Sequence, residues 1–417
     1  MTRGRTAASC TRCFGAIWKG DAEMIAPLIW LVAAPPILAL SVFVAEMLLG
    51  TARARRRSFP ATMPSTVLLI PAHNEAATIG ATLQQLEPLL SDRISLLVVA
   101  DNCTDETAQI ARAAGHRVVE RADETQRGKG YALSFGRDCL KSDPPGCVIV
   151  FDADCETDAE SIADLARACI GANSVMQARY VLHSDKAASP KVQISNFAFW
   201  VKNVVRQRGL KRLGGGAVLV GTGMAFPWKI FKDMPLATAN IVEDLALGIH
   251  LTQAGRAPAY LEQALVSSAA ASESATLGQR TRWEHGFLGM AKSHALPALG
   301  QGIARGNRTL FQLGLHLLVP PLAFLILCSL AVLVLLGGLA LLTGYWLPAI
   351  TLALCVAAAA AMVILNWAIE GHRWLSFGAM LRLPFYFIWK IPVYLRFAKG
   401  DVAGWTRTER PTNRAEP

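Results

Sequence analysis

Three acidic motifs stand in the middle of this chain, each directly after a short apolar run. They read Pro71-Ala-His-Asn-Glu75, Asp101-Asn-Cys-Thr-Asp105 and Asp152-Ala-Asp154. Two carboxylates on alternate positions of an extended segment can hold a hard divalent cation, which would neutralise the charge of a departing diphosphate. Oxygen ligands favour Mg²⁺ or Mn²⁺ over zinc. Asp152 and Asp154 are therefore the candidate metal ligands.

A second acidic pair, Glu243-Asp244, precedes a stretch of helical type that runs to about Ala254. A reaction in which a hydroxyl attacks needs a base to take its proton. The helix dipole favours the ionised form of a carboxylate in the first helical turn, so we expect this pair to be able to accept that proton. A simple charge at the start of a helix is the alternative reading of the dipeptide.

Two glycine-containing segments stand between these motifs. Arg127-Gly-Lys-Gly-Tyr131 places one cation, Lys129, in open backbone. It is not a Walker A loop, because Asp123 stands where that loop needs its first glycine. Gly221-Thr-Gly223 follows an apolar run, and glycine there permits the close approach of a ligand. A plain surface loop and a tight turn are the alternatives.

The pentapeptide Gln279-Arg-Thr-Arg-Trp283 is the most specific single motif. Arg282 can pair with a diphosphate as its negative charge grows. The indole of Trp283 offers a flat face for stacking a sugar or a lipid headgroup. An amphipathic interfacial helix is the alternative. The sequence assigns no role to His285, which follows closely.

The elements that must position these motifs alternate between strand and helix types. The strand-like runs are Val67–Ile70, Leu96–Ala100 and Cys147–Phe151. The helical segments are Thr78–Leu90, Asp105–Ala114 and Lys129–Cys139. This alternation predicts a parallel sheet with helices on both faces, in which ligands bind beyond the carboxyl ends of the strands. We also expect Asn74 to cap a helix beginning near Glu75, and Asp105 to cap the next helix.

In order and spacing, the motifs resemble the membrane-bound glycosyltransferases of family 2 that share Asp-x-Asp, Glu-Asp and Gln-x-x-Arg-Trp motifs. Cellulose and hyaluronan synthases and bacterial exopolysaccharide transferases belong to that group. The resemblance covers roughly residues 64–290. It implies an α/β fold of GT-A type, with a mainly parallel Rossmann-like sheet, helices on both faces and transmembrane helices beside it.

The resemblance also implies an inverting transfer from a UDP-sugar, in which Asp101 contacts uracil and Asp244 is the base, supported by Glu243. Asp152 and Asp154 would hold Mg²⁺ or Mn²⁺, with Asp154 the closer ligand. The residues implied to bind the nucleotide-sugar are Pro71, His73, Glu75, Asp101, Lys129, Asp152, Gln279, Arg282 and Trp283. The residues implied to bind the acceptor are Gly221, Thr222, Gly223 and Trp283.

The bulk composition indicates a membrane protein. Of 417 residues, 53% are hydrophobic and only 17% are charged. The apolar residues gather at 25–50 and 311–370, and the second stretch is interrupted at Thr343-Gly-Tyr345. We therefore predict one transmembrane helix and one transmembrane hairpin. The basic cluster Arg53–Arg57 favours a cytoplasmic flank after the first span; a cleaved signal peptide is the competing reading.

The predicted organisation follows from these segments. It is a tail at 1–24, a transmembrane helix at 25–50, a cytoplasmic GT-A glycosyltransferase domain at 51–310, a transmembrane hairpin at 311–370, interfacial helices or an additional span at 371–398, and a basic tail at 399–417. The formal net charge is +10. Much of the basic excess lies beside apolar segments, which favours membrane lipids over nucleic acid as partners. The expected location is the bacterial inner membrane, with the protein multi-pass and its catalytic domain cytoplasmic.

Three functions remain open. We favour single addition of a sugar to a lipid, lipid-linked or glycan acceptor in cell-envelope or exopolysaccharide biosynthesis, because three spans are few for a polymer channel. A processive polysaccharide synthase is the alternative, with a homo-oligomer or other envelope-glycan assembly proteins as partners. An inactive nucleotide-sugar-binding scaffold is more remote, because every expected carboxylate is present. The donor sugar is not identified by the sequence.

Overall fold

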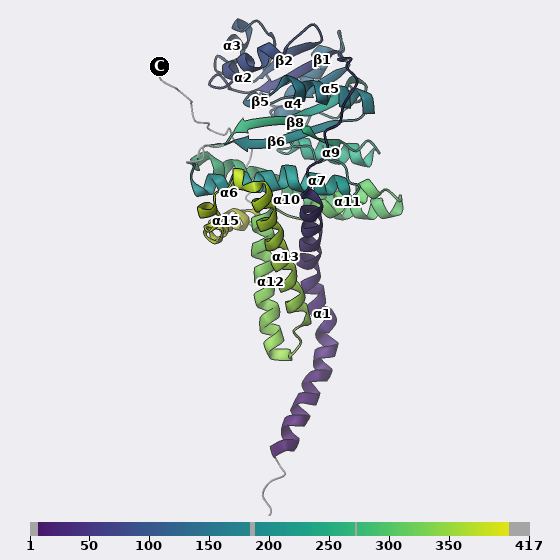
Figure 1. Ribbon diagram of the computed structural model, residues 1–417, viewed down its shortest axis with the longest axis vertical. Coiled ribbons are helices and arrows are strands. Elements are labelled where there is room, and N and C mark those ends of the chain that lie inside the picture. The colour runs from purple at the N-terminus through teal and green to yellow at the C-terminus, as the bar shows by residue number, and fades with distance from the viewer. Residues whose placement is uncertain (1–6, 184–187, 272, 400–417) are drawn as a thin grey trace, which may run out of the picture. The chain divides into compact units, whose positions relative to one another are not determined.

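The computed structural model describes residues 7–183, 188–271 and 273–399 (Figure 1). It divides into two compact units. The first combines Met1–Ala45 with Val319–Leu365, and the second combines Glu46–Leu318 with Asn366–Pro417. The predicted basic tail lies outside the described residues from 400 onward, as do the first six residues of the predicted N-terminal tail.

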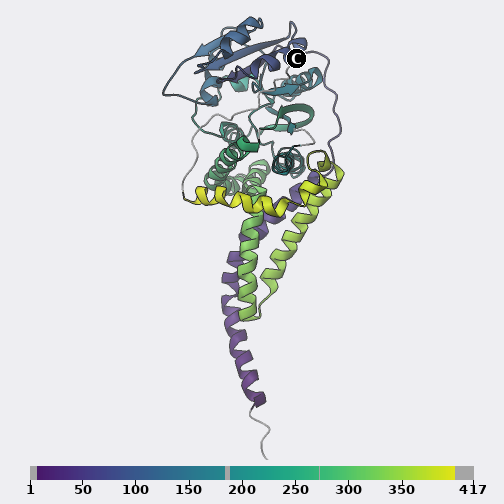
Figure 2. The ribbon, with the colours of Figure 1, turned by 90° about the vertical axis from the view of Figure 1, so that its left-hand side faces the viewer.

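Among the described residues, three apolar helical segments are long enough to cross a membrane by length and composition, namely Ile25–Gly50, Leu322–Thr343 and Leu347–Ile369. The first lies in α1 (Ala7–Gly50), and the others are α12 (Leu322–Thr343) and α13 (Leu347–Ile369). Gly344 ends α12 with a φ of 73°. From this turn α12 and α13 run in opposite directions, as expected for a hairpin (Figure 2).

Two element boundaries differ from the predicted organisation. The helix α1 begins at Ala7, so helical structure extends into the predicted tail. The hairpin starts later than residue 311. Helical structure is interrupted at Pro320-Pro321, so residues 308–317 form a separate helix, α11 (Arg308–Leu317). Proline lacks the N–H that a helix needs and disfavours helical backbone at the residue before it, which explains the break.

An eight-stranded sheet forms the centre of the second unit, in the order β3-β2-β1-β4-β7-β6-β8-β5. The strands are β1 (Thr66–Ala72), β2 (Ile94–Asp101), β3 (Arg117–Arg121), β4 (Cys147–Val150), β5 (Cys155–Thr157), β6 (Met176–His183), β7 (Met224–Pro227) and β8 (Ala259–Ala269). Within the described residues, four of the seven strand pairings are parallel; β7 opposes β4 and β6, and β5 opposes β8. The predicted α/β class is confirmed, and the described residues also include the predicted apolar helices.

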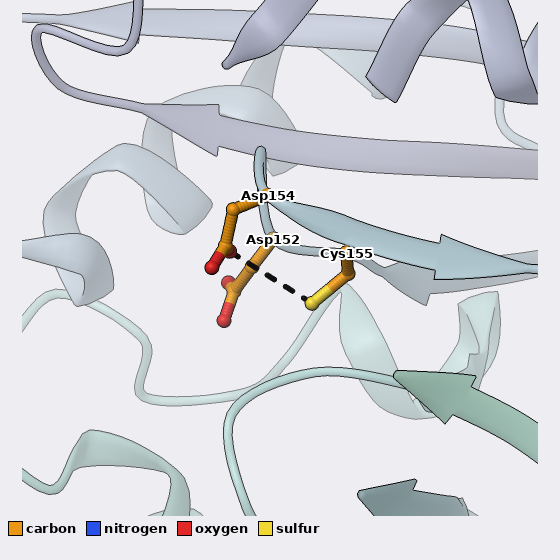
Figure 3. Close-up of side chains that lie close together, drawn as sticks. All are labelled: Asp152, Asp154 and Cys155. Carbon is orange, nitrogen blue, oxygen red and sulfur yellow. Dashed lines mark hydrogen bonds between the residues drawn. The ribbon is translucent and has the colours of Figure 1, made fainter. Parts of the chain in front are cut away.

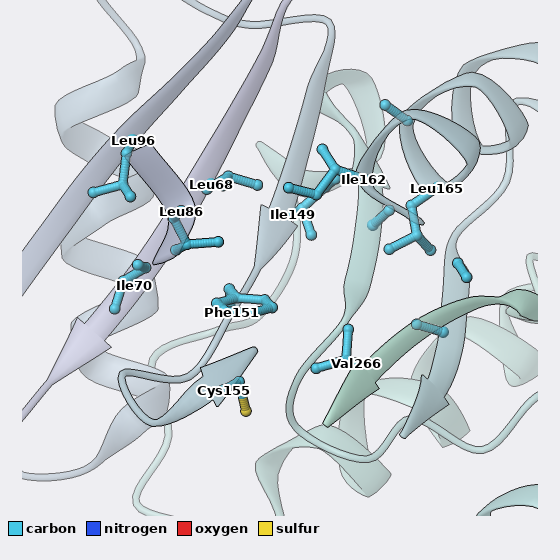
Figure 4. Packing of buried hydrophobic residues seen from close by; sticks show 14 of the residues in the cluster. Leu68, Ile70, Leu86, Leu96, Ile149, Phe151, Cys155, Ile162, Leu165 and Val266 are labelled. Atoms are coloured by element: carbon cyan, nitrogen blue, oxygen red, sulfur yellow. The ribbon is translucent and has the colours of Figure 1, made fainter. Parts of the chain in front are cut away.

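Alternating side chains of the central strands enter two separate cores, which is the period-two pattern of a strand covered on both faces. Leu68 and Ile149 face one core (Figure 4), whereas Leu69 and Val148 face the other. The first core is covered by α2 (Ile79–Leu86), α3 (Thr107–Ala113) and α5 (Ala159–Ala172). The second is covered by α4 (Lys129–Leu140), α8 (Trp228–Phe231) and α9 (Glu243–Gln253). A 3₁₀ turn at Glu87–Leu89 follows α2.

A long helical stretch between β6 and β7 carries a local irregularity. It runs through α6 (Pro190–Trp200), a π-helical turn at Val201–Val205 and α7 (Arg206–Arg212). The 32-residue helix α10 (Glu273–Ala304) packs against α6, α9 and α11. Such π-helical turns are uncommon, and those that occur frequently lie at functional sites.

The segment 371–398 forms short helices. They are a 3₁₀ turn at Gly371–Arg373, α14 (Phe377–Met380) and α15 (Leu383–Ala398). With 16 residues, α15 spans about 24 Å, which is less than the roughly 30 Å of a hydrocarbon core. This length favours the interfacial reading over an additional span.

Candidate active site

The carboxyl ends of β1, β2 and β4 lie at one edge of the sheet, and the first three motifs lie there. Asp101 is the last residue of β2, and Nδ1 of His73 lies 2.7 Å from its carbonyl oxygen. The N–H of Glu75 donates to the hydroxyl of Thr107 at 2.8 Å. Pro71 is half-buried within β1. The loops after β1 and β2 are thus tied together, as parallel neighbouring strands require.

The turn at Asn74 differs from the predicted helix cap. The helix α2 begins only at Ile79, and Asn74 adopts left-handed backbone with a φ of 55°. Its Oδ1 accepts from the N–H of Thr104 at 2.7 Å, so it bridges to the next loop instead. The N-cap of α3 is Glu106 rather than the predicted Asp105, but the carboxylate of Asp105 accepts from the N–H of Thr107, the first residue of α3, at 3.1 Å.

The buried carboxylate of Asp101 has a partner that the motifs do not indicate. Nη1 of Arg121, at the end of β3, donates to Asp101 Oδ1 at 2.7 Å. The same guanidinium pairs with Asp123 at 3.0 Å and lies over the ring of Tyr131. Arg121 therefore fixes the orientation of Asp101. Its role was missed because β3 itself was not recognised in the sequence.

Asp152, Asp154 and Cys155 bring their ligand atoms within 4.8 Å of one another after β4 (Figure 3). Cys155 Sγ lies 3.9 Å from Asp154 Oδ1. Burial raises the pKa of the Cys155 thiol well above its ordinary value, and the nearby Asp154 and Asp152 add to the effect. The thiol is therefore protonated, and the two half-buried carboxylates are the donors that fit a hard cation such as Mg²⁺ or Mn²⁺.

Lys129, at the start of α4, lies against this carboxylate pair. Its ammonium is ion-paired with Asp152 and donates to the carbonyl of Gly221 at 2.7 Å. Burial lowers the pKa of Lys129, but Asp152, Glu243 and Asp244 together outweigh that effect and raise the pKa above its ordinary value. Lys129 is therefore a permanent positive charge among the candidate catalytic carboxylates.

Gly221, with a φ of +90°, brings the cation and the candidate base together. A Cβ atom at this position would lie 3.3 Å from Asp244 Oδ2 and 3.4 Å from Lys129 Nζ. The backbone of Gly221 thus lies directly between these two side chains. Only a residue without a side chain fits this conformation and this approach without strain.

Gly221, Thr222 and Gly223, which the resemblance assigns to the acceptor, are all buried. The hydroxyl of Thr222 accepts from the N–H of Asp152 at 3.1 Å, and the N–H of Gly223 donates to the carbonyl of Val150 at 2.9 Å. These residues support the Asp152 loop, and their contact with an acceptor stays a prediction.

Glu243 and Asp244 open α9 as predicted. Asp244 Oδ1 accepts from the N–H of Leu245 at 2.7 Å, which favours its ionised form. Burial opposes this and raises the pKa of Asp244 above its ordinary value. Burial and the neighbouring Asp244 also raise the pKa of Glu243, to about 8. Burial therefore acts on both carboxyl groups against the helix dipole.

The Gln279–Trp283 motif lies on α10, which packs beside the loop that precedes Glu243. A Cβ atom on Gly286 would lie 2.6 Å from Val242. Trp283 packs on Phe199, with ring centroids 5.5 Å apart. Gln279 and Arg282 are half-buried on the same helix.

Arg280 is a residue of this motif that sequence reasoning passed over. It is buried, its Nε donates to Ser195 at 2.6 Å, and its guanidinium lies 4.8 Å from the centroid of the Trp283 ring. Arg280 therefore fixes the indole against α6. Its position inside the pentapeptide was the available signal.

Glu284 and His285 attach α10 to α15. The carboxylate of Glu284 pairs with Lys390 Nζ at 2.8 Å and accepts from the hydroxyl of Tyr394 at 2.9 Å. Nε2 of His285 lies 2.9 Å from the carbonyl of Val393. His285, whose role could not be predicted from the sequence, is thus a structural contact between two helices.

An α/β domain with paired carboxylates beyond its parallel strands is typical of enzymes that bind nucleotides. Residues 67–234 match the family model Glycosyl transferase family 2. This segment is therefore similar to glycosyltransferases of family 2. The match ends before Glu243 and does not include the Gln279–Trp283 motif.

Two curated proteins are similar over part of the chain. A probable glycosyltransferase, YdaM, of Bacillus subtilis (strain 168) is 32% identical over 100 residues, which are 22% of this chain and 23% of that protein. The glycosyltransferase AglD of Haloferax volcanii is 31% identical over 106 residues, 24% of this chain and 16% of that protein. The chain thus spans less than a quarter of the length of either relative.

Solved structures are similar at lower identity. The mannosyltransferase PcManGT from Pyrobaculum calidifontis, in complex with GDP-Man and Mn²⁺, is 16% identical with a TM-score of 0.49, covering 81% of this chain and 99% of its own. Glucosyl-3-phosphoglycerate synthase from Mycobacterium tuberculosis, in complex with Mn²⁺, UDP and phosphoglyceric acid, is 19% identical with a TM-score of 0.38, covering 54% and 84%.

Proposed function

We propose that this chain is an integral-membrane glycosyltransferase of GT-A type that transfers a sugar from a UDP-sugar to a lipid or lipid-linked acceptor with inversion. The observation that carries the proposal is the convergence of Lys129, Gly221 and Asp244 beside the Asp152–Asp154 pair. The family 2 match over residues 67–234 supports the reaction type.

The donor would bind at the carboxyl edge of the sheet. Asp152 and Asp154 would hold Mg²⁺ or Mn²⁺, which supplies positive charge against the departing diphosphate. Lys129 adds a fixed cation on the same side, since it already pairs with Asp152. Asp101, oriented by Arg121, would accept from the imide N–H of uracil. Pro71, His73 and Glu75 would line the base and ribose from the loop after β1.

Asp244 would be the base. Its carboxylate takes the proton from the acceptor hydroxyl, while the oxygen of that hydroxyl forms a bond to the anomeric carbon. The bond from that carbon to the diphosphate breaks, and UDP leaves from the opposite face. One in-line displacement inverts the configuration and gives a β-linkage. Glu243 would support it as its neighbour, and burial raises the pKa of both carboxyl groups.

The acceptor would be presented at a membrane surface. The exposed side of α15 carries Phe385, Ile388 and Leu395, whereas Lys390 and Tyr394 face α10. An apolar exposed face of this kind suits the headgroup boundary. With the three candidate spans, it supports a multi-pass location in the bacterial inner membrane, with the catalytic domain cytoplasmic and acting in cell-envelope or exopolysaccharide biosynthesis. Gln279, Arg282 and Trp283 would complete the site from α10.

The decisive test is turnover by the detergent-purified protein with a panel of UDP-sugars, Mn²⁺ and bacterial inner-membrane lipid extract. We expect a labelled glycolipid of one size, made by the wild type and lost in Asp244→Asn. A ladder of products would show a processive synthase instead. UDP and Mn²⁺ binding without transfer for every donor would show an inactive scaffold, and equal turnover by Asp244→Asn would refute the assignment of the base.

A further inference from the structure

Lys202 lies on the π-helical turn Val201–Val205, where the long helix between α6 and α7 departs from regular α-geometry. A π-turn changes the direction in which side chains project and is retained most often where it aims a residue at a functional site. Lys202 is half-buried, whereas its neighbours Val201 and Asn203 are fully buried. The turn thus leaves this one basic side chain partly accessible.

Two basic residues that follow on the same stretch, Arg206 and Arg208, are paired with carboxylates. Arg206 Nε donates to Glu46 at 2.6 Å, and Arg208 pairs with both Glu262 and Glu370. Both arginines are buried, and each has a buried carboxylate partner, as a buried charge requires. Structural pairing therefore explains Arg206 and Arg208.

Lys202 is different. Its Nζ lies 5.2 Å from the centroid of the Phe287 ring on α10. Among the residues that the structure describes, no carboxylate lies within ion-pair distance of this ammonium. A cation–π contact offsets only part of the free-energy cost of removing a charge from water. Lys202 is thus a half-buried cation without an anionic partner in the described chain.

The aromatic ring beside this cation packs against the helix that begins with the candidate base. Phe287 packs in one core with Leu245 and Ile249 of α9, the helix that opens with Glu243-Asp244. Burial lowers the pKa of Lys202 to about 8, and Arg206 and Arg280 contribute, while Asp244 and Glu284 oppose the shift. The ammonium is therefore mostly protonated at neutral pH, and it acts on Asp244 from the side of α6 and α10.

We propose that Lys202 binds an anionic group of the acceptor, a phosphate or carboxylate, next to the hydroxyl that Asp244 deprotonates. This inference rests on the proposed function. The donor diphosphate is assigned to Asp152 and Asp154, where Lys129 already supplies a cation. Lys202 comes from different elements, so an anion bound to it belongs to the second substrate. A phosphate close to the membrane surface would most simply be a lipid headgroup.

The probe for this site is monododecyl phosphate, with its binding measured by calorimetry in detergent with UDP and Mn²⁺ present. We expect the wild type to bind it and Lys202→Met to bind it about 10-fold more weakly or worse, because a charge-assisted hydrogen bond is lost. Lys202→Arg should keep most of the affinity. The matched control is Lys211→Met, which removes a half-buried lysine that bonds only to the carbonyl of Tyr260 and should change nothing.

Inorganic phosphate separates the two sources of the anion. Competition by inorganic phosphate at similar concentration would indicate a site for a free phosphate group, whereas competition only by alkyl phosphates would indicate a lipid headgroup; both support an anion at Lys202. Equal binding of monododecyl phosphate by the wild type and Lys202→Met would overturn the proposal, as would absence of binding to the wild type. A selective loss of UDP affinity in Lys202→Met would also overturn it, because it would place Lys202 on the donor side.

Turnover distinguishes this inference from the proposed function. If the wild type transfers sugar to a neutral lipid and Lys202→Met has the same KM for that lipid, only the anion site is wrong. If no donor is used at all while alkyl phosphate binding still depends on Lys202, the transferase proposal fails and the anion site stands as a binding site of other purpose. With the expected acidic acceptor, Lys202→Met should raise the acceptor KM at least 10-fold and leave UDP binding unchanged.

Discussion

Lys129 and Asp152 form a direct ion pair at the carboxyl edge of the sheet. Asp152 is also one of the three side chains, with Asp154 and Cys155, that form the only candidate metal-ligating group within the described residues. A metal ion that binds Asp152 therefore competes with the Lys129 ammonium for the same carboxylate. Once displaced, the ammonium would pair with another negative charge nearby. In the proposed donor complex that charge is the diphosphate, so the pair couples metal binding to placement of Lys129.

Replacement of Lys129 by methionine separates these two roles. We expect turnover to fall by about 100-fold, because a charge-assisted donor to the diphosphate is lost. We expect Mn²⁺, measured by electron paramagnetic resonance without nucleotide, to bind as well as or better than in the wild type. Lys141→Met, on the exposed end of the same segment and paired with Asp138, is the control. Weaker Mn²⁺ binding in Lys129→Met would contradict the assigned competition.

Asp154→Asn tests the metal site itself. Removing one of two carboxylates should weaken Mn²⁺ binding at least 10-fold and lower turnover by about 100-fold or more, since the charge on the diphosphate is no longer neutralised. Chelation of the wild type with EDTA should abolish turnover, and added Mn²⁺ should restore it. Glu156→Gln removes an exposed carboxylate two residues away and should be neutral. Full turnover of Asp154→Asn would exclude the Asp152–Asp154 pair as the metal site.

The neighbouring carboxyl groups of Glu243 and Asp244, at the start of α9, predict an unusual pH dependence of kcat. The pKa of Glu243 is raised to about 8 and that of Asp244 is raised as well, both chiefly by burial. A base acts only when ionised, so kcat should rise with increasing pH through an apparent pKa well above that of an ordinary carboxyl group. Glu243→Gln removes the neighbouring negative charge that Glu243 contributes, so the rising limb should move to lower pH.

Measurement of kcat from pH 5 to pH 9.5 for the wild type and Glu243→Gln checks the direction of this shift. Asp244→Asn should lower kcat by about 10² to 10⁴ at every pH, with UDP binding unchanged. The exposed Asp233→Asn should keep the wild-type profile. A limb that stays in place or moves to higher pH in Glu243→Gln would show that the two carboxyl groups do not share a titration.

The local part of this site could be predicted from the sequence. Asp101, Asp152 and Asp244 each stand immediately beyond a recognisable strand or at the start of a recognisable helix, and local periodicity is enough to place them. The prediction for Asn74 failed because a cap preference is also local, and here the N–H of Thr104 in the neighbouring loop competes for the same side chain.

Contacts that depend on strand register or on tertiary packing could not be predicted. Asp101 meets Arg121 because β2 and β3 pair in parallel with these residues in register, and a sequence pattern does not specify register. Lys129 meets the carbonyl of Gly221 across 92 positions of the chain. The raised pKa of Asp244 could not be predicted for the same reason, since the helix dipole follows from the local helix whereas the burial follows from the whole fold.

The contact between Glu284 and Lys390 predicts how much α15 contributes to stability. Lys390 is fully buried, and its ammonium pairs with Glu284 at 2.8 Å. Glu284→Gln would leave a buried cation without its counter-charge and should lower the free energy of unfolding by about 3 kcal/mol. The double variant Glu284→Gln/Lys390→Met removes both charges and should recover a large part of that loss. Reversible SDS titration in mixed micelles would measure the free energy of unfolding of the wild type, Glu284→Gln and the double variant.

Glu120→Gln provides the matched control, because its partner Arg112 and Glu120 itself are both exposed and such pairs contribute less than about 1 kcal/mol. If Glu284→Gln is as stable as the wild type, Lys390 cannot be buried as described and α15 must detach from α10 readily. If instead the double variant is as unstable as Glu284→Gln, the loss comes from the second bond of Glu284, to the hydroxyl of Tyr394. Tyr394→Phe would then reproduce it, and the attachment of α15 would depend on that hydrogen bond rather than on the ion pair.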